Sequence, residues 1–298
     1  MGQGEEKKTR PDSPVEILER GEIFFFYRPR VNREEAHSLD DVQRLFIVLR
    51  PESGDRPTED KQEPDSGKEG SKRRHDSSSS PSGSKEGGHG VQVHSHGAQI
   101  PSGPKQEQGP PLLGLRRSGD YETASGGKRH EAAARAVGEG VYRILRHNPG
   151  SKKMHTHLVY KLELPAAEGK TKSHEPQEAL HIEREGSFVI QIKNPESGSG
   201  SGSGFGGLRE KRRAQFPAHL QGGFGTSRRF GPADPPDLLN YEGCEFLMIA
   251  AADDVEEELG LELEVENERW EEEGSCSDLV KEFGDVVAPA PLLEGTWA

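Results

Sequence analysis

The stretch that decides the fold is Gly21-Glu22-Ile23-Phe24-Phe25-Phe26-Tyr27-Arg28-Pro29, whose apolar centre lies between a glycine and a proline. A run of this length, rich in aromatic residues and bounded by turn formers, is typical of a strand buried on both faces. A second apolar run covers residues 45–49 and stops at Pro51. Residues 15–51 are therefore predicted to form the first strand pair of a core.

More strands are predicted C-terminal to this pair. Residues 141–145 and 158–164 are apolar runs on either side of a turn at 148–150, and residues 187–193 place alternate apolar side chains on one face. Short helices are expected between such strands. The expected fold class is mostly β, a sandwich or barrel-like sheet with several short helices and a long disordered insertion.

The apolar residues are distributed unevenly along the chain. Leaving out alanine, only seven apolar residues occur in the 85 positions from Glu52 to Ala136. Segments this poor in apolar residues cannot offset the entropy lost on folding. The predicted organisation is a disordered tail (1–14), the first strand pair (15–51), a disordered low-complexity insertion (52–118) and the remainder of the β-rich domain (119–298), with a flexible Gly/Ser connector at 197–204.

The acidic charge is concentrated in one segment. The formal net charge is 39 − 52 = −13, and residues 253–273 hold twelve acids and one base. The rest of the chain is nearly neutral, so nucleic-acid binding is not expected. The acidic segment is interpreted as a solvated surface or as a docking surface for an unknown basic protein partner.

The sequence predicts an intracellular protein. It has two cysteines, Cys244 and Cys276, too few for a disulfide scaffold, and its N-terminus lacks an apolar signal region. No run reaches the length of a membrane span. The expected location is cytoplasmic. A nuclear location is the alternative, because Lys72-Arg73-Arg74 and Lys211-Arg212-Arg213 have the composition of import signals.

His155-Thr156-His157 is the main candidate for chemistry, because histidines two apart on a strand share a face and can bind one metal ion. With Gly150, Glu163 and Gly169 the pair comes near the metal motif of cupins, but all three intervals differ from that motif. The favoured interpretation is a solvated strand face, opposite the apolar face formed by residues 158, 160, 162 and 164. We expect no stoichiometric metal here, and a third ligand would have to come from another strand, such as His37 or His181.

No catalytic residue and no cofactor is predicted from the sequence. The expected function is a binding or interaction module of unknown biochemical activity. The alternative is a metal-dependent, cupin-like β-barrel enzyme acting on a small molecule. A concave site with converging polar groups would favour the enzyme.

Several phrases of the sequence resemble a conserved family of uncharacterised proteins, known mainly from plants with relatives in bacteria. They are residues 19–29, 183–188, 193–195, 235–243 and the ending Gly295-Thr296-Trp297. The resemblance covers about residues 15–51 and 137–298. It implies no activity, and it implies additional apolar strands before Tyr121, where this chain has only short fragments such as Val91-Gln92-Val93.

Overall fold

The computed structural model describes a mostly β protein with short helices, as the sequence predicts. The described residues are 5–11, 13–52, 92–96, 115, 118–124, 126–150, 153–165, 175–197, 208, 213–224, 228–241, 243–251, 254–265 and 290–297. Most of the predicted insertion and of the Gly/Ser connector, Cys276 and the run Lys72-Arg73-Arg74 lie outside these residues. No helix among the described residues is long and apolar enough to cross a membrane.

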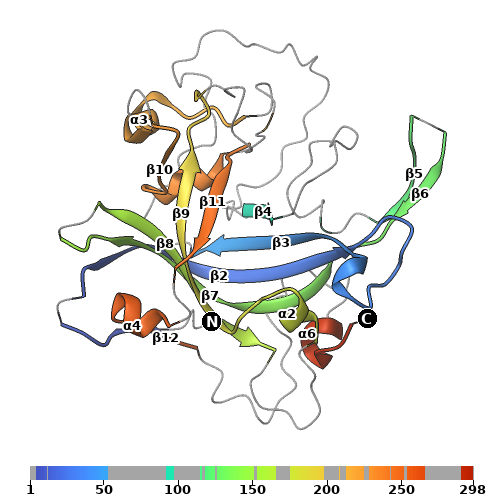
Figure 1. Cartoon of the computed structure of the whole chain (residues 1–298), viewed down its shortest axis with the longest axis horizontal. Helices are drawn as coiled ribbons and strands as arrows, with labels where there is room; N and C mark the ends of the chain where they lie inside the picture. Colours follow the sequence, from blue (N-terminus) through green and yellow to red (C-terminus); the bar gives the residue numbers. More distant parts are fainter. Residues whose placement is uncertain are drawn as a thin grey trace, which may run out of the picture.

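One antiparallel sheet dominates the molecule and curls like part of a barrel (Figure 1). Its strands lie in the order β10-β9-β8-β7-β2-β3-β4, and β11 also pairs with β9. Their bounds are β2 (Val15–Pro29), β3 (Val42–Pro51), β4 (Gln92–His96), β7 (Arg135–His147), β8 (His155–Leu164), β9 (Glu185–Lys193), β10 (Phe230–Pro232) and β11 (Phe246–Ala250).

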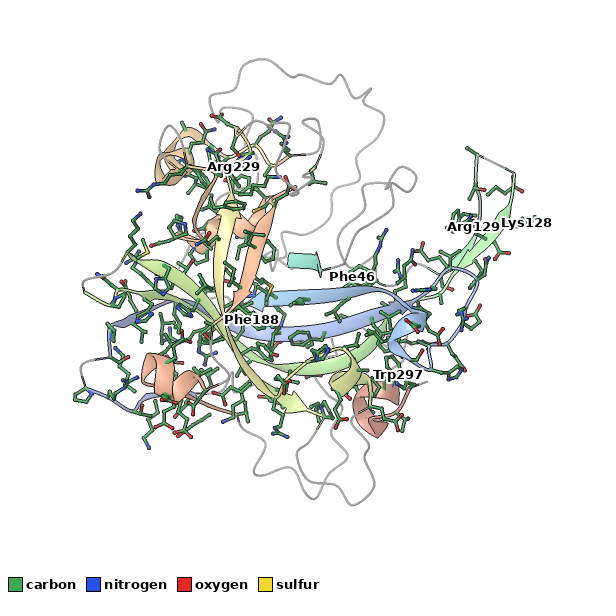
Figure 2. All side chains as sticks on the ribbon, in the orientation of Figure 1. Phe46, Lys128, Arg129, Phe188, Arg229 and Trp297 are labelled. Carbon is green, nitrogen blue, oxygen red and sulfur yellow. The ribbon has the colours of Figure 1, made fainter. Side chains whose placement is uncertain are left out.

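Smaller elements surround this sheet. Strand β1 (Glu5–Lys8) pairs with β12 (Leu261–Glu264), and β5 (Gly119–Glu122) pairs with β6 (Lys128–Glu131) in a projecting hairpin. The described α-helices are α2 (Glu175–Ala179), α3 (Ala218–Gln221), α4 (Val255–Leu259) and α6 (Ala290–Glu294). Near α6, the Trp297 ring lies 5.4 Å from the ring of Tyr27, which fixes the C-terminal segment against β2 (Figure 2).

Strand β2 is the centre of the core, and the aromatic run is buried on both faces as predicted. It pairs with β3 on one side and with β7 on the other. Ile23, Phe25 and Tyr27 join the largest apolar cluster on one face, while Phe24 and Phe26 join a second cluster on the other. Alternation of side chains along a strand explains this division.

The prediction that β8 has a solvated face is wrong. Leu158, Tyr160 and Leu162 face the largest cluster, as expected. The other face is also covered, because α4 and β12 pack Val255, Leu259, Leu261 and Leu263 against Val15, Leu145 and Val159. We call this second side of β7, β8 and β9 the histidine face. A helix and a strand from the acidic segment take the place that solvent was expected to occupy.

Two predicted disordered regions contain ordered residues. In the predicted tail, β1 pairs with β12, and the Glu6 carboxylate accepts hydrogen bonds from Arg20 and Arg143. In the predicted insertion, the backbone of β4 pairs with β3, and Leu115 is fully buried in the second cluster. Charged or isolated apolar residues carry little signal in a sequence, and here they are ordered by partners far away in the chain.

Candidate metal centre

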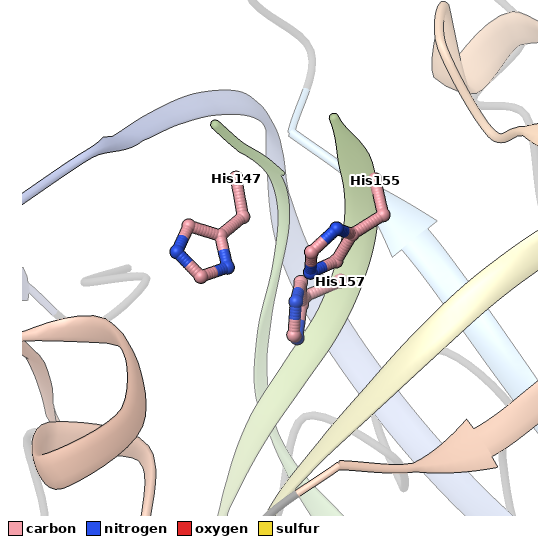
Figure 3. Close-up of side chains that lie close together, drawn as sticks. All are labelled: His147, His155 and His157. Carbon is pink, nitrogen blue, oxygen red and sulfur yellow. The ribbon is translucent and has the colours of Figure 1, made fainter. Parts of the chain in front are cut away.

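Three histidines meet at the end of the β7–β8 strand pair. His147 is the last residue of β7, and His155, the first residue of β8, is its partner in register. His157 follows two positions later, so all three side chains lie on the histidine face. Each offers a ring nitrogen, and these three nitrogens all lie within 4.8 Å of one another (Figure 3).

The strand pairing positions this group. The chain leaves β7 at His147 and returns at His155 through the turn region predicted at 148–150, where Gly150 has a positive φ of 72°. The Asn148 N–H donates to the Pro14 carbonyl oxygen at 3.0 Å, which ties the end of β7 to the start of β2. The group therefore rests on paired strands rather than on a loose loop.

The histidines differ in burial. His157 is 0 % exposed, while His147 and His155 are partly exposed. Ring centroids are 4.9 Å apart for His155 and His157, and 5.3 Å apart for His147 and His157. Burial, together with the two neighbouring imidazoles, lowers the pKa of His157 to about 3. The innermost imidazole is therefore neutral at physiological pH, which is the form that binds metal ions.

The rings of His155 and His157 each have a polar partner at Nδ1. Nδ1 of His157 lies 3.0 Å from the Ser187 hydroxyl oxygen, and Nδ1 of His155 lies 3.0 Å from the Lys153 carbonyl oxygen. Nε2 of His157 is buried and has no hydrogen-bond partner among the described residues. A buried nitrogen without a partner, on a ring that neighbours two other imidazoles, indicates a position for a ligand.

The donor set indicates a class of metal. The group consists of three imidazoles, and no carboxylate or thiol of the described residues belongs to it. Imidazole ligands suit zinc, copper, iron and nickel, whereas magnesium and calcium take oxygen ligands. Zn–N distances of about 2.0–2.1 Å in a tetrahedral site place ligand nitrogens about 3.3 Å apart. Metal binding thus requires the rings to move together by up to about 1.5 Å.

The structure brings together both sequence-predicted ligands and adds one that sequence reasoning missed. His147 was missed because its pairing with His155 depends on the register of β7 against β8, which the predicted turn at 148–150 does not set. The proposed third ligands do not contribute: His37 is exposed beside Glu35, and His181 is exposed in the turn after α2. Glu163 is not a member of the group.

The other candidate groups offer less. Cys244 packs against the largest apolar cluster, and burial raises the pKa of its thiol to about 12. A hollow on the face opposite the histidines is lined only by apolar side chains, from β3, β8, β9, β11 and Leu239. Neither offers a converging set of polar groups. Among the described residues, the three histidines are the group best suited to bind a metal ion.

Comparison with known proteins returned nothing similar: no family model, no curated protein and no solved structure matches the chain. The family resemblance of the sequence phrases therefore stays a prediction.

Proposed function

We propose that this chain binds a divalent transition metal ion, zinc before others, through His147, His155 and His157, and that it acts as a metal-dependent enzyme on a small molecule. The observation that carries the proposal is the convergence of three ring nitrogens within 4.8 Å on paired strands. The sequence alone favoured a binding module, because it offered two histidines on a face expected to be solvated.

The number of ligands supports an enzyme over a structural metal site. Structural zinc sites have four protein ligands, whereas catalytic sites have three and keep one position open. Here three histidines supply three ligands, and the partial exposure of His147 and His155 leaves a side for solvent or substrate to approach. A zinc ion in such a site lowers the pKa of a bound water to about 7 and polarises carbonyl groups. The buried His157 anchors the inner side of the site.

Metal analysis tests the proposal. Protein equilibrated with zinc and then desalted is expected to retain about one equivalent, measured together with copper, iron and manganese by elemental analysis. Replacing His147, His155 or His157 by alanine should remove it. His37→Ala is the matched control, because this histidine is exposed and far from the group in sequence. Wild-type protein that retains less than a tenth of an equivalent, or alanine variants at these three positions that still retain zinc, would contradict the proposal.

A second candidate function is docking of a basic protein partner on α4. The observation that favours it is the exposure of Glu256 and Glu257 on this helix, within the acidic segment 253–273. Part of that segment already binds a basic residue of the same chain, because Arg10 donates hydrogen bonds to the carbonyl oxygens of Glu256 and Glu257. Binding of a lysine-rich peptide, measured by fluorescence anisotropy, should weaken in high salt and in the Glu256→Gln, Glu257→Gln double variant. Unchanged binding in that variant would exclude α4 as the site.

A further inference from the structure

Ser187 carries a buried hydroxyl within a strand. It lies in β9, opposite Val159 of β8, and is 2 % exposed. Buried polar groups in folded proteins have hydrogen-bond partners, and its partner is Nδ1 of His157 at 3.0 Å. The residue therefore contacts a ring of the candidate metal centre directly.

The direction of this hydrogen bond decides what His157 can bind. If the hydroxyl donates to Nδ1, the ring proton sits on Nε2, where it has no acceptor and blocks a metal ion. If Nδ1–H donates to the hydroxyl, Nε2 presents a lone pair to the group. Orphaned buried N–H groups are rarer than under-satisfied acceptors, so the second arrangement is favoured.

The neighbouring ring, His155, also has a polar partner at Nδ1, and here the direction of the hydrogen bond is fixed. Nδ1 of His155 lies 3.0 Å from the Lys153 carbonyl oxygen, which can only accept a hydrogen bond. His155 therefore carries its proton on Nδ1 and presents the Nε2 lone pair. Partners of this kind behind metal-binding histidines fix the tautomer and the ring orientation.

We propose that Ser187 is a positioning residue for the metal centre: its hydroxyl accepts from Nδ1–H of His157 and so aims the Nε2 lone pair at the metal position. The inference rests on the proposed function, since it assigns a role toward the same three histidines. Ser187 does not contact the metal. Of the two outer partners, it is the one that a substitution can remove, because the other is a backbone carbonyl.

The test compares three substitutions at one position with a matched control. Ser187→Ala removes the acceptor, Ser187→Cys keeps the volume with a weak acceptor, and Ser187→Thr keeps the hydroxyl on a good strand former. Thr156→Val is the control. Its hydroxyl lies in the neighbouring strand, where it donates to the Ile190 carbonyl at 2.9 Å and accepts from the Ala233 N–H at 2.8 Å.

Two quantities are measured for each protein: zinc affinity by competition with a chelating dye, and the visible spectrum of the cobalt-loaded form. Ser187→Ala and Ser187→Cys are expected to bind zinc about 10–100-fold more weakly with an altered cobalt spectrum. Ser187→Thr should stay near the wild-type values. Thr156→Val should lower thermal stability while leaving both quantities unchanged.

The outcomes separate this inference from the proposed function. Wild-type affinity and spectrum in both Ser187→Ala and Ser187→Cys would overturn the role of Ser187 while leaving the three-histidine centre in place. An equal loss of affinity in Ser187→Ala and Thr156→Val would also overturn it, because that result marks a general packing effect. Failure of the wild-type protein to bind zinc or cobalt would instead refute the proposed function.

Discussion

At the scale of single residues, His157 combines full burial with a neutral ring. Its Nε2 lacks a hydrogen-bond partner among the described residues, and its pKa lies at about 3, mainly because of burial. In an unfolded chain the pKa of histidine is about 6.5. In mild acid this imidazole is therefore neutral in the folded, metal-free protein but protonated in the unfolded chain.

This difference predicts a pH dependence of stability. Above about pH 6.5 the imidazole is neutral in both states and contributes nothing. Between about pH 6.5 and 3 only the unfolded state takes up the proton, so the free energy of unfolding should fall as the pH falls. Urea unfolding of metal-stripped protein at several pH values checks this. His157→Asn keeps a polar group near Ser187 but does not titrate, so its stability should fall less steeply; parallel curves would contradict the prediction.

Phe25→Ala is expected to destabilise the protein by about 3–5 kcal/mol, the usual cost of truncating a core phenylalanine. Phe25 is 4 % exposed, and its ring lies 5.2 Å from the ring of Tyr160 in the largest cluster. Urea unfolding measures the loss. Leu39→Ala, at a half-exposed position, should change stability by less than about 0.5 kcal/mol. A loss under about 1 kcal/mol for Phe25→Ala would show that the aromatic run is not packed as described.

The burial and the grouping of these residues could be predicted from the sequence to different extents. The burial of Phe25 was predictable, because a continuous aromatic run between turn formers has few other solutions. His155 and His157 were identifiable as a pair by spacing alone. Their burial was not, because the parity rule assumes solvent on the second face, whereas α4 and β12 cover it. His147 required the register of β7 against β8, which no local pattern encodes.

At the scale of elements, β1 shows how a charged segment can be ordered by one buried partner. Its sequence, Glu5-Glu6-Lys7-Lys8, has no apolar residue. Arg143 is fully buried on the histidine face, and its Nε donates to the Glu6 carboxylate at 2.8 Å. Burial alone would raise the pKa of Glu6, but hydrogen bonds from Arg20 and Arg143 outweigh it and hold that pKa below its ordinary value. Such an element is invisible to hydrophobic periodicity.

Glu6→Gln is expected to destabilise the protein by about 1–3 kcal/mol, because it removes the charge that faces a buried guanidinium. The matched control is Glu5→Gln in the same strand, where the side chain is exposed and the change should stay below about 0.5 kcal/mol. Chemical unfolding of both variants at pH 7 gives the comparison. Equal effects of the two substitutions would mean that the contact with Arg143 does not order β1.

At the scale of the whole molecule, the core and its sheet include short pieces of the long low-complexity region. Arg28 and Ala134 both donate hydrogen bonds to the Leu115 carbonyl oxygen, at 3.4 Å and 3.0 Å. Leu115 is fully buried among residues of β2, β3 and the start of β7. The backbone of β4 extends the sheet beside β3, with Gln92 opposite Leu49. The composition of residues 52–118 predicted a disordered low-complexity insertion, but β4 and Leu115, two short pieces of it, belong to the fold.

Two deletions are therefore expected to differ. Removing residues 53–90 keeps β4 and Leu115, and a short linker can join Pro51 to β4 because the register places Gln92 opposite Leu49. The melting temperature of this deletion variant should stay within about 3 °C of that of the intact chain, a shift that corresponds to about 1 kcal/mol.

Removing residues 52–118 also takes away a fully buried leucine, which alone costs about 2–5 kcal/mol. Its melting temperature should fall by about 5 °C or more. Leu115→Ala in the full chain is the control for the larger deletion and should reproduce most of its effect. Two deletions with the same melting temperature would show that Leu115 and β4 add nothing to the stability of the sheet.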